Sequence, residues 1–169
     1  GIVSTASLMI GVTAATPDES SFIVTAGVAG IVAGAMSMAV GEYVSVRSQN
    51  DVEDSDRHLE IEHLAIDPEG ELLELTQIYI ERGLTPELAK QVAEQMHSRD
   101  ALEAHLRDEL GQTPESKARP MQAAIASAAS FTLGGLVPFV GVFAPTPGAI
   151  ALSIVVFALI GLLLSLIHI

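Results

Sequence analysis

All eight lysines and arginines of this 169-residue chain lie between Arg47 and Arg119. The segments on either side are long apolar stretches joined by short loops that carry no basic residue. Loops that stay in the cytoplasm carry an excess of lysine and arginine. The sequence therefore predicts an all-α protein, with a polytopic helical membrane domain and an inserted helical domain that lies in the cytoplasm.

The inserted segment is strongly acidic. The net charge of the chain is −13, and 18 of its 21 acidic residues lie between Asp51 and Glu115. Such a segment repels nucleic acid and favours cations, including metal ions, as partners. Because the chain has no cysteine, a metal must be held by carboxylate, imidazole or thioether groups.

The apolar segments differ in length. Ser20–Val46 has Glu42 as its only charge and is long enough to span a bilayer. Met121–Val142 and Gly148–Leu164 form a second apolar pair, separated by a loop with two prolines. Gly1–Ala15 would rise only about 22 Å, against a hydrocarbon core of about 30 Å. We expect it to be a partial first span.

The predicted domains follow from these segments. Residues 1–47 hold transmembrane helices 1 (partial) and 2, residues 48–119 form the cytoplasmic acidic helical metal-binding domain, and residues 120–169 hold transmembrane helices 3 and 4. The last six residues, LSLIHI, match the translation of a sequencing-adapter end and are interpreted as an artefact. Within the second span, small residues recur at steps of three and four and predict close helix packing: Gly27, Gly30, Gly34, Gly41 and Ser45.

Proline, glycine and capping residues divide the acidic segment into short helices. The predicted ranges are Asp51–Ile66, Pro68–Arg82, Pro86–His97 and Asp100–Leu110. Metal ligands on one helix face must lie three or four residues apart. The pairs that meet this spacing are Glu60 with His63, Glu71 with Glu74, Glu94 with His97, and His105 with Glu109. Together they predict an oxygen and nitrogen site for Fe²⁺, Mn²⁺ or Zn²⁺.

Two of these pairs have the Glu-x-x-His spacing that also occurs in di-iron carboxylate bundles. Those bundles need long helices, whereas the predicted helices here have about eleven to sixteen residues. A ferritin-like di-iron protein, tethered to the membrane, is therefore the second interpretation. A metal buffer or sensor that transports nothing is a further alternative.

Several motifs occur in a fixed order along the chain: GIVSTASLMIGV, AGIVAGAMSMAVGEYVSVRSQ, DPEGELLEL, IYIERGL, DELG and LGGLVPF. In these motifs and their order the chain resembles the vacuolar iron transporter family, as a bacterial-type member. The resemblance implies a dimeric five-helix membrane domain that exports Fe²⁺ or Mn²⁺ from the cytosol in exchange for protons. It implies no enzymatic activity and no organic cofactor. We expect this chain to lack the start of the first span and the fifth span.

The resemblance also implies ligands. The glutamates of the family's cytoplasmic helices fall on Glu60, Glu71, Glu74 and Glu109. His63 stands where many relatives have glutamate, and His105 where plant relatives have a methionine that helps to bind metal. Imidazole can replace either ligand, although His63 removes one negative charge.

In the membrane the resemblance places Met38 on the transport pathway. An aspartate of the family would immediately precede Gly1, and Gly30 replaces a glutamate of some vacuolar members. We therefore expect Glu42 to lie on the transport pathway, because a carboxylate inside a membrane needs a partner, water or a proton path. Overall we expect a homodimeric integral protein of a bacterial inner membrane, in contact with lipid, divalent ions and protons and with no nucleic acid.

Overall fold

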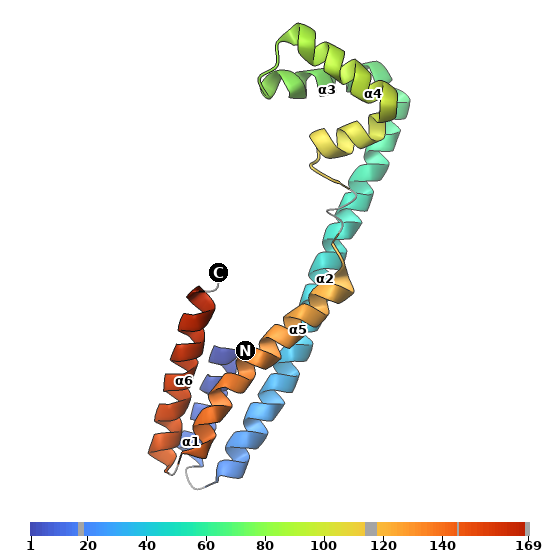
Figure 1. The fold of residues 1–169 in the computed structure, drawn as a ribbon. Coiled ribbons are helices and arrows are strands. Elements are labelled where there is room, and N and C mark those ends of the chain that lie inside the picture. The colour runs from blue at the N-terminus through green and yellow to red at the C-terminus, as the bar shows by residue number, and fades with distance from the viewer. Residues whose placement is uncertain (17–18, 114–117, 145, 168–169) are drawn as a thin grey trace. The chain divides into compact units, whose positions relative to one another are not determined.

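The computed structural model describes residues 1–16, 19–113, 118–144 and 146–167. Its elements in chain order are α1 (Ile2–Ala15), α2 (Ser20–Ile66), α3 (Pro68–Glu81), α4 (Pro86–Asp108), α5 (Pro120–Leu136), the 3-10 helix η2 (Val137–Phe143) and α6 (Pro147–Ile167) (Figure 1). The described residues contain no strand. The prediction of an all-α chain is therefore confirmed.

The chain forms two compact units. The apolar unit comprises Gly1–Ser45 and Pro120–Ile169, and the polar unit comprises Val46–Arg119. Helix α2 contributes its first part to the apolar unit and its second part to the polar unit. We predicted a separate cytoplasmic helix from Asp51, but no breaker residue interrupts the chain between Val46 and Ile66, and the helix runs through.

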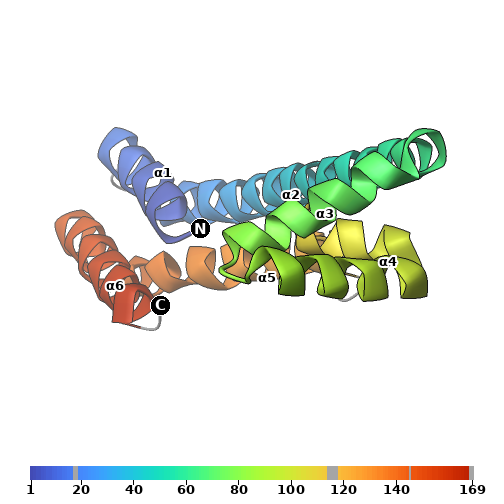
Figure 2. The same ribbon diagram turned by 90° about the horizontal axis from the view of Figure 1, so that it is seen from above.

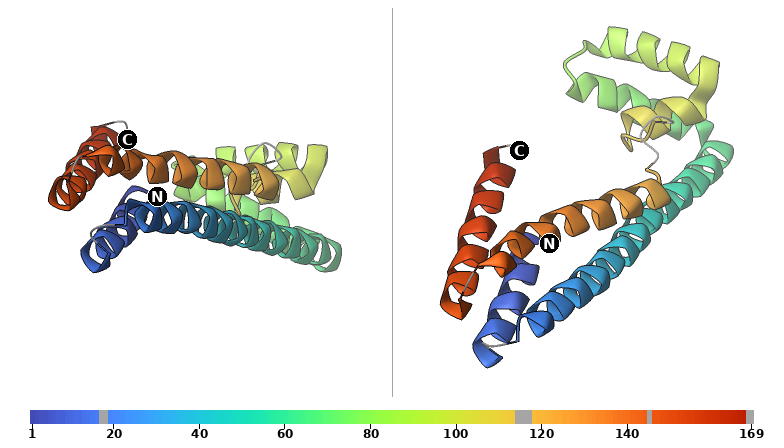
Figure 3. Two further views of the ribbon diagram at one scale, coloured as in Figure 1. Left: turned by 90° about the horizontal axis from the view of Figure 1, so that it is seen from below. Right: turned by 60° about the horizontal axis from the view of Figure 1, so that its bottom comes forward.

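In the apolar unit, α1 packs against α5, η2 and α6 (Figure 2, Figure 3). Its buried core contains Ala6 and Met9 of α1, Ile23 of α2, and Ile150 and Ile154 of α6. Residues 150 and 154 are one helical turn apart, so α6 places both side chains on the same face. This core joins segments from both ends of the chain.

Gly27, Gly30 and Gly34 of α2 lie at close helix contacts, as their spacing predicts, whereas nothing lies within 4 Å of a Cβ atom added at Gly41 and Ser45 is exposed. A Cβ atom added at Gly34 would lie 2.1 Å from Cζ of Phe131 in α5. One added at Gly30 would lie 2.7 Å from Cδ2 of Leu8 in α1. A larger side chain at either position would require the Phe131 ring or the Leu8 side chain to shift.

Another face of α2 exposes large apolar side chains at every fourth residue. Val24, Val28, Val32, Met36 and Val40 are 39–65% exposed. By length and composition, two helical segments among the described residues could cross a membrane, one within α2 and one at Pro120–Phe143. The other two predicted spans appear as the shorter apolar helices Ile2–Ala15 and Gly148–Gly161.

The third predicted span is not a single α-helix. Helix α5 ends at Leu136, and the chain continues as the 3-10 helix η2. Pro138, which has no backbone N–H, cannot donate the next hydrogen bond of an α-helix. The apolar run to Val142 predicted the segment but not this change of helix type.

The polar unit is built around the pair α3 and α4 (Figure 1). Leu75 and Tyr79 of α3 pack with Ala89, Ala93 and Ala104 of α4 in its buried core. The alanines let the two helices approach closely. This small core positions the polar side chains described below.

Candidate metal centre

Glu60 and Glu71 come together because α2 and α3 are separated by a single residue, Asp67. The Asp67 side chain caps α3 by accepting a hydrogen bond of 2.9 Å from the backbone N–H of Gly70. Pro68 occupies the first turn, where a missing N–H costs nothing. The tight turn therefore places Glu71, in the first turn of α3, beside the last turns of α2.

Helix α4 contains a kink that brings its last turns back towards the site. The backbone of Asp100 leaves the helical region, with φ −159° and ψ 95°. Its side chain then caps the second part of the helix, accepting a 2.9 Å hydrogen bond from the backbone N–H of Glu103. His105 and Glu109 lie in this second part, four residues apart and on one face.

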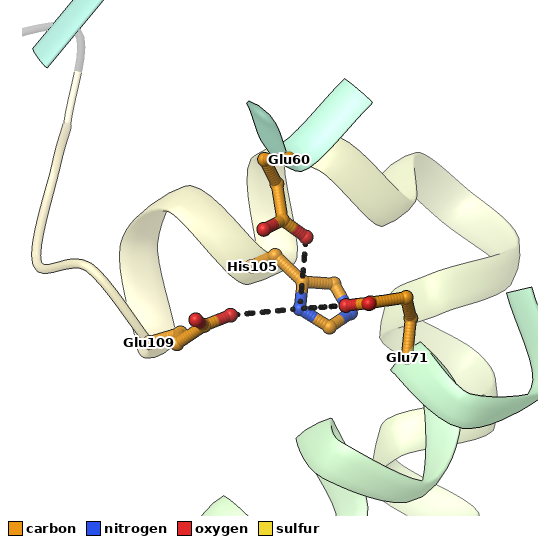
Figure 4. Close-up of side chains that lie close together, drawn as sticks. All are labelled: Glu60, Glu71, His105 and Glu109. Carbon is orange, nitrogen blue, oxygen red and sulfur yellow. Dashed lines mark hydrogen bonds and ion pairs between the residues drawn. The ribbon is translucent and has the colours of Figure 1, made fainter. Parts of the chain in front are cut away.

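These three helices bring four potential ligands together. Ligand atoms of Glu60, Glu71, His105 and Glu109 lie within 4.8 Å of one another. Figure 4 shows the three carboxylates pointing towards one nitrogen of the imidazole, Nδ1 of His105. The distances from this nitrogen are 3.2 Å to Glu60, 3.7 Å to Glu71 and 3.2 Å to Glu109. We call these residues the four-ligand group.

The centre of the group is shielded from solvent. The side chains of His105 and Glu60 are 0% and 5% exposed, whereas that of Glu109 is 27% exposed. Burial raises the pKa of Glu60 most strongly, and the carboxylates of Glu109 and Glu71 raise it further, while His105 lowers it. Burying several carboxylates together is unfavourable unless positive charge accompanies them. A divalent cation bound here would supply that charge.

Beside the group, a second cluster fixes the end of α4 to α3. Asp108 accepts hydrogen bonds from the Tyr79 hydroxyl at 2.8 Å and from the guanidinium groups of Arg82 and Arg107 at 2.7 and 2.6 Å. Burial alone would raise the pKa of Asp108, but the hydrogen bonds from Arg107, Arg82 and Tyr79 lower it to about 2. Asp108 therefore stays ionised and holds the turn that carries Glu109.

The predicted ligands are not all in the group. The structure brings together Glu60, Glu71, His105 and Glu109. The Nδ1 atom of His63 lies 3.9 Å from a Glu71 oxygen, but its side chain is 59% exposed. Glu74 is exposed and lies outside the group. The three-residue spacing of Glu71 and Glu74 predicted a shared face, but α3 turns only Glu71 towards α4.

The two proposed pathway residues belong to the apolar unit. Met38 is 45% exposed and Glu42 is also exposed. Both lie on α2, and neither belongs to the four-ligand group.

Helical spacing predicts that His97 shares a face with Glu94, whereas in the structure the His97 ring contacts the ring of His105. The two imidazole rings lie 6.1 Å apart between centroids and are nearly perpendicular, at 80°. Eight residues separate them in sequence, with the kink between, so no helical spacing rule could find this contact. The cluster around Asp108 was also missed, because nothing in the local pattern singles out its partners on α3.

The chain is similar in sequence to known proteins. The model of the VIT family matches residues 1–168. A protein of Acanthamoeba castellanii named vacuolar iron transporter is 46% identical over 135 residues, which are 79% of this chain and 52% of that protein. Vacuolar iron transporter homolog 4 of Arabidopsis thaliana is 34% identical over 175 residues, covering 98% of this chain and 64% of that protein.

A third relative, vacuolar iron transporter 1 of Arabidopsis thaliana, is 31% identical over 122 residues, which are 71% of this chain and 49% of that protein. The chain thus spans about half to two thirds of the length of these curated relatives. The family model, in contrast, covers nearly all of the chain. The chain belongs to the VIT family.

Proposed function

We propose that this chain is part of a divalent-metal transporter, with Fe²⁺ or Mn²⁺ as its cargo, and that the polar unit binds the ion on the cytoplasmic side. The observation that carries the proposal is the four-ligand group, in which Glu60 and His105 are buried. Relatives of similar sequence are named iron transporters, which supports iron as a cargo. Family membership supports an integral membrane location.

The donor set suits such ions. Three carboxylates and one imidazole offer oxygen and nitrogen ligands, which iron, manganese and zinc all accept. With the imidazole neutral and the three carboxylates ionised, the group has a net charge of −3, and a bound divalent ion changes it to −1.

Protons compete with metal for the same carboxylates. Because the pKa of Glu60 is raised by burial, protonation of Glu60 begins at a higher pH than for an ordinary glutamate. In the proposed cycle the ion is collected at the four-ligand group in the cytosol and passes Met38 and Glu42 in the membrane. It leaves in exchange for protons. A homodimer would place two such pathways side by side.

The ligand assignment is tested by isothermal titration calorimetry with Zn²⁺ or Mn²⁺ on the whole chain in detergent. Glu71→Ala should weaken binding more than about 10-fold, because it removes a buried ligand. Glu74→Ala is the matched control, an exposed glutamate on the same helix, and should stay within about twofold. Equal effects of the two variants, or none from either, would contradict the four-ligand group as the binding site.

Transport is tested with a chain extended at both ends to the length of its relatives and reconstituted in sealed vesicles. Metal-dependent proton movement, lost in Glu60→Gln and kept in the exposed control Glu62→Gln, supports exchange. A second candidate is a membrane-tethered metal buffer, which the location of all four ligands within the polar unit favours. Metal binding without proton or ion movement would support the buffer and overturn the transporter.

A further inference from the structure

Four buried atoms of the polar unit have no hydrogen-bond partner among the described residues: Oδ1 of Asn50, and three atoms at or beside the four-ligand group, namely Oε1 of Glu60, Nε2 of His105 and Nδ1 of His97. A buried polar atom without a partner is unfavourable and needs an explanation. A cation in the four-ligand group accounts for the Glu60 oxygen. It does not account for the two imidazole nitrogens, which belong to neighbouring rings.

The nitrogen of His105 that faces the carboxylates is Nδ1. A nitrogen that ligates a metal has given its lone pair to the ion and carries no hydrogen, so a neutral ligating His105 carries its hydrogen on Nε2. Histidine ligands almost always donate that second N–H to an acceptor, which fixes the ring and strengthens the ligand. In His105 this N–H is fully buried and requires such an acceptor.

We propose that His97 is this partner and positions His105 for metal binding through a hydrogen bond between Nε2 of His105 and Nδ1 of His97. The inference rests on the proposed metal site and names a residue that completes it. The ring centroids are 6.1 Å apart. In a linear N–H···N bond of about 2.9 Å the ring centroids lie about 5 Å apart, so a side-chain rotation of His97 that brings the rings about 1 Å closer would form it. His97 is partly exposed, so its ring has room to turn.

Imidazole suits this role because its nitrogen can accept or donate. Without metal, His105 keeps its hydrogen on Nδ1, facing the carboxylates, and its bare Nε2 accepts from Nδ1–H of His97. When the ion arrives, the Nδ1 hydrogen of His105 leaves as a proton, and the hydrogen on His97 Nδ1 moves to His105 Nε2. His97 then takes a proton on Nε2 from solvent. Each ring ends neutral with one hydrogen, and the bond between them is kept with its direction reversed.

His97 is a positioning residue rather than a ligand. The group whose ligand atoms lie within 4.8 Å of one another contains His105 but not His97. The Nδ1 atom of His97 is buried, and the His97 ring lies nearly perpendicular to the ring of His105. Its expected effect is therefore on the tautomer and affinity of His105 and not on the number of ligands.

The test uses the whole chain in detergent micelles, with ¹⁵N-labelled histidine and Zn²⁺ as a diamagnetic probe. In the wild type, NMR of the zinc-bound protein should show His105 with metal on Nδ1 and hydrogen on Nε2. His97→Phe, which keeps the bulk of the ring and removes both nitrogens, should lose this single tautomer. It should also bind Zn²⁺ about 10–100-fold more weakly, the range found for such partners.

His97→Asn should rescue both properties to within about threefold, because its amide can place an acceptor or a donor near the Nδ1 position. His58→Asn is the matched control, since His58 is exposed on α2 and should change neither property. Unchanged tautomer and affinity in His97→Phe would overturn the proposal. So would zinc-induced shifts showing that His97 itself binds the ion.

The two proposals fail in different ways. If the wild type does not bind Zn²⁺ at all, the proposed metal site fails. The contact between the rings is still tested in the metal-free chain, where His97→Phe should shift the Nε2 resonance of His105 and His58→Asn should not. No such shift would overturn the pairing independently of metal binding.

Discussion

The two units differ in where their energetically unfavourable groups lie: on the surface of the apolar unit and in the interior of the polar unit. In the apolar unit the core is hydrocarbon, and α2 exposes a row of valines and Met36 that water does not favour. In the polar unit the surface is acidic, and the buried side chains include Glu60 and His105. The exposed apolar face of the apolar unit suits a lipid environment, whereas the buried carboxylates of the polar unit suit the cation that we propose. Each depends on a partner that suits its proposed role.

The largest expected effect comes from removing an apolar side chain from the core of the polar unit. Leu75 of α3 is fully buried, and Leu75→Ala should lower the free energy of unfolding of this unit by about 2–5 kcal/mol. The control is Leu73→Ala on the same helix, where the side chain is 70% exposed. Tyr79 fluorescence during urea unfolding, in a Tyr43→Phe background, measures both. Equal losses would show that α3 does not pack as described.

The second prediction concerns the cation. Zn²⁺ at about 100 times its Kd should stabilise the polar unit by about 2.7 kcal/mol, because it binds only the folded unit. Amide hydrogen exchange should slow in α3 and the second part of α4, and not in α1 or α5. Glu60→Gln should remove the protection. Protection spread evenly over both units would contradict a separate site in the polar unit.

The third prediction concerns the contact between η2 and α6 in the apolar unit. A Cβ atom at Gly141 of η2 would lie 2.5 Å from the backbone nitrogen of Ile154 in α6. Because backbone cannot move aside easily, Gly141→Ala should destabilise the unit by about 1–3 kcal/mol. Gly11→Ala is the control, since nothing lies within 4 Å of its added Cβ. Thermal unfolding in detergent should separate them, and a stable Gly141→Ala would mean that η2 and α6 are further apart.

The smallest expected effect is a pH dependence. The pKa of Asp108 is lowered from 3.8 to about 2 by its hydrogen bonds. Since the folded pKa is below the unfolded one, the stabilisation is complete above about pH 4. It is lost as pH falls from about 4 to about 2, and amounts to at most about 2 kcal/mol. In urea unfolding followed by Tyr79 fluorescence, Asp108→Asn should lack this loss; an unchanged pH profile would contradict the Asp108 cluster.

The fold was largely readable from the sequence where the pattern is local. Pro68, Thr85 and Pro86 predicted the starts of α3 and α4, and Gly83 predicted the end of α3. Of the small residues of α2, Gly27, Gly30 and Gly34 lie at the predicted close contacts. Two features were missed. The change from apolar to acidic residues suggested a new helix after Val46, but no helix breaker follows Val46 and α2 continues. The 3-10 helix η2 results from the local effect of Pro138.

The candidate site was less readable, because spacing shows which side chains share a helix face but not which face turns inward. Glu71 and Glu74 are equivalent by spacing, yet the packing of Leu75 and Tyr79 on α4 selects Glu71. The same packing joins His97 to His105 across the kink at Asp100.

The sequence by itself determined the apolar and acidic segments, the helical class and the kinds of ligand, because these follow from composition and short-range periodicity. Tertiary structure alone decided that Glu60, Glu71, His105 and Glu109 meet, and that His97 lies beside them. The physical reason is that a metal site is a convergence of three helices, α2, α3 and α4. The angles between helices depend on side-chain packing between elements that are distant in the chain.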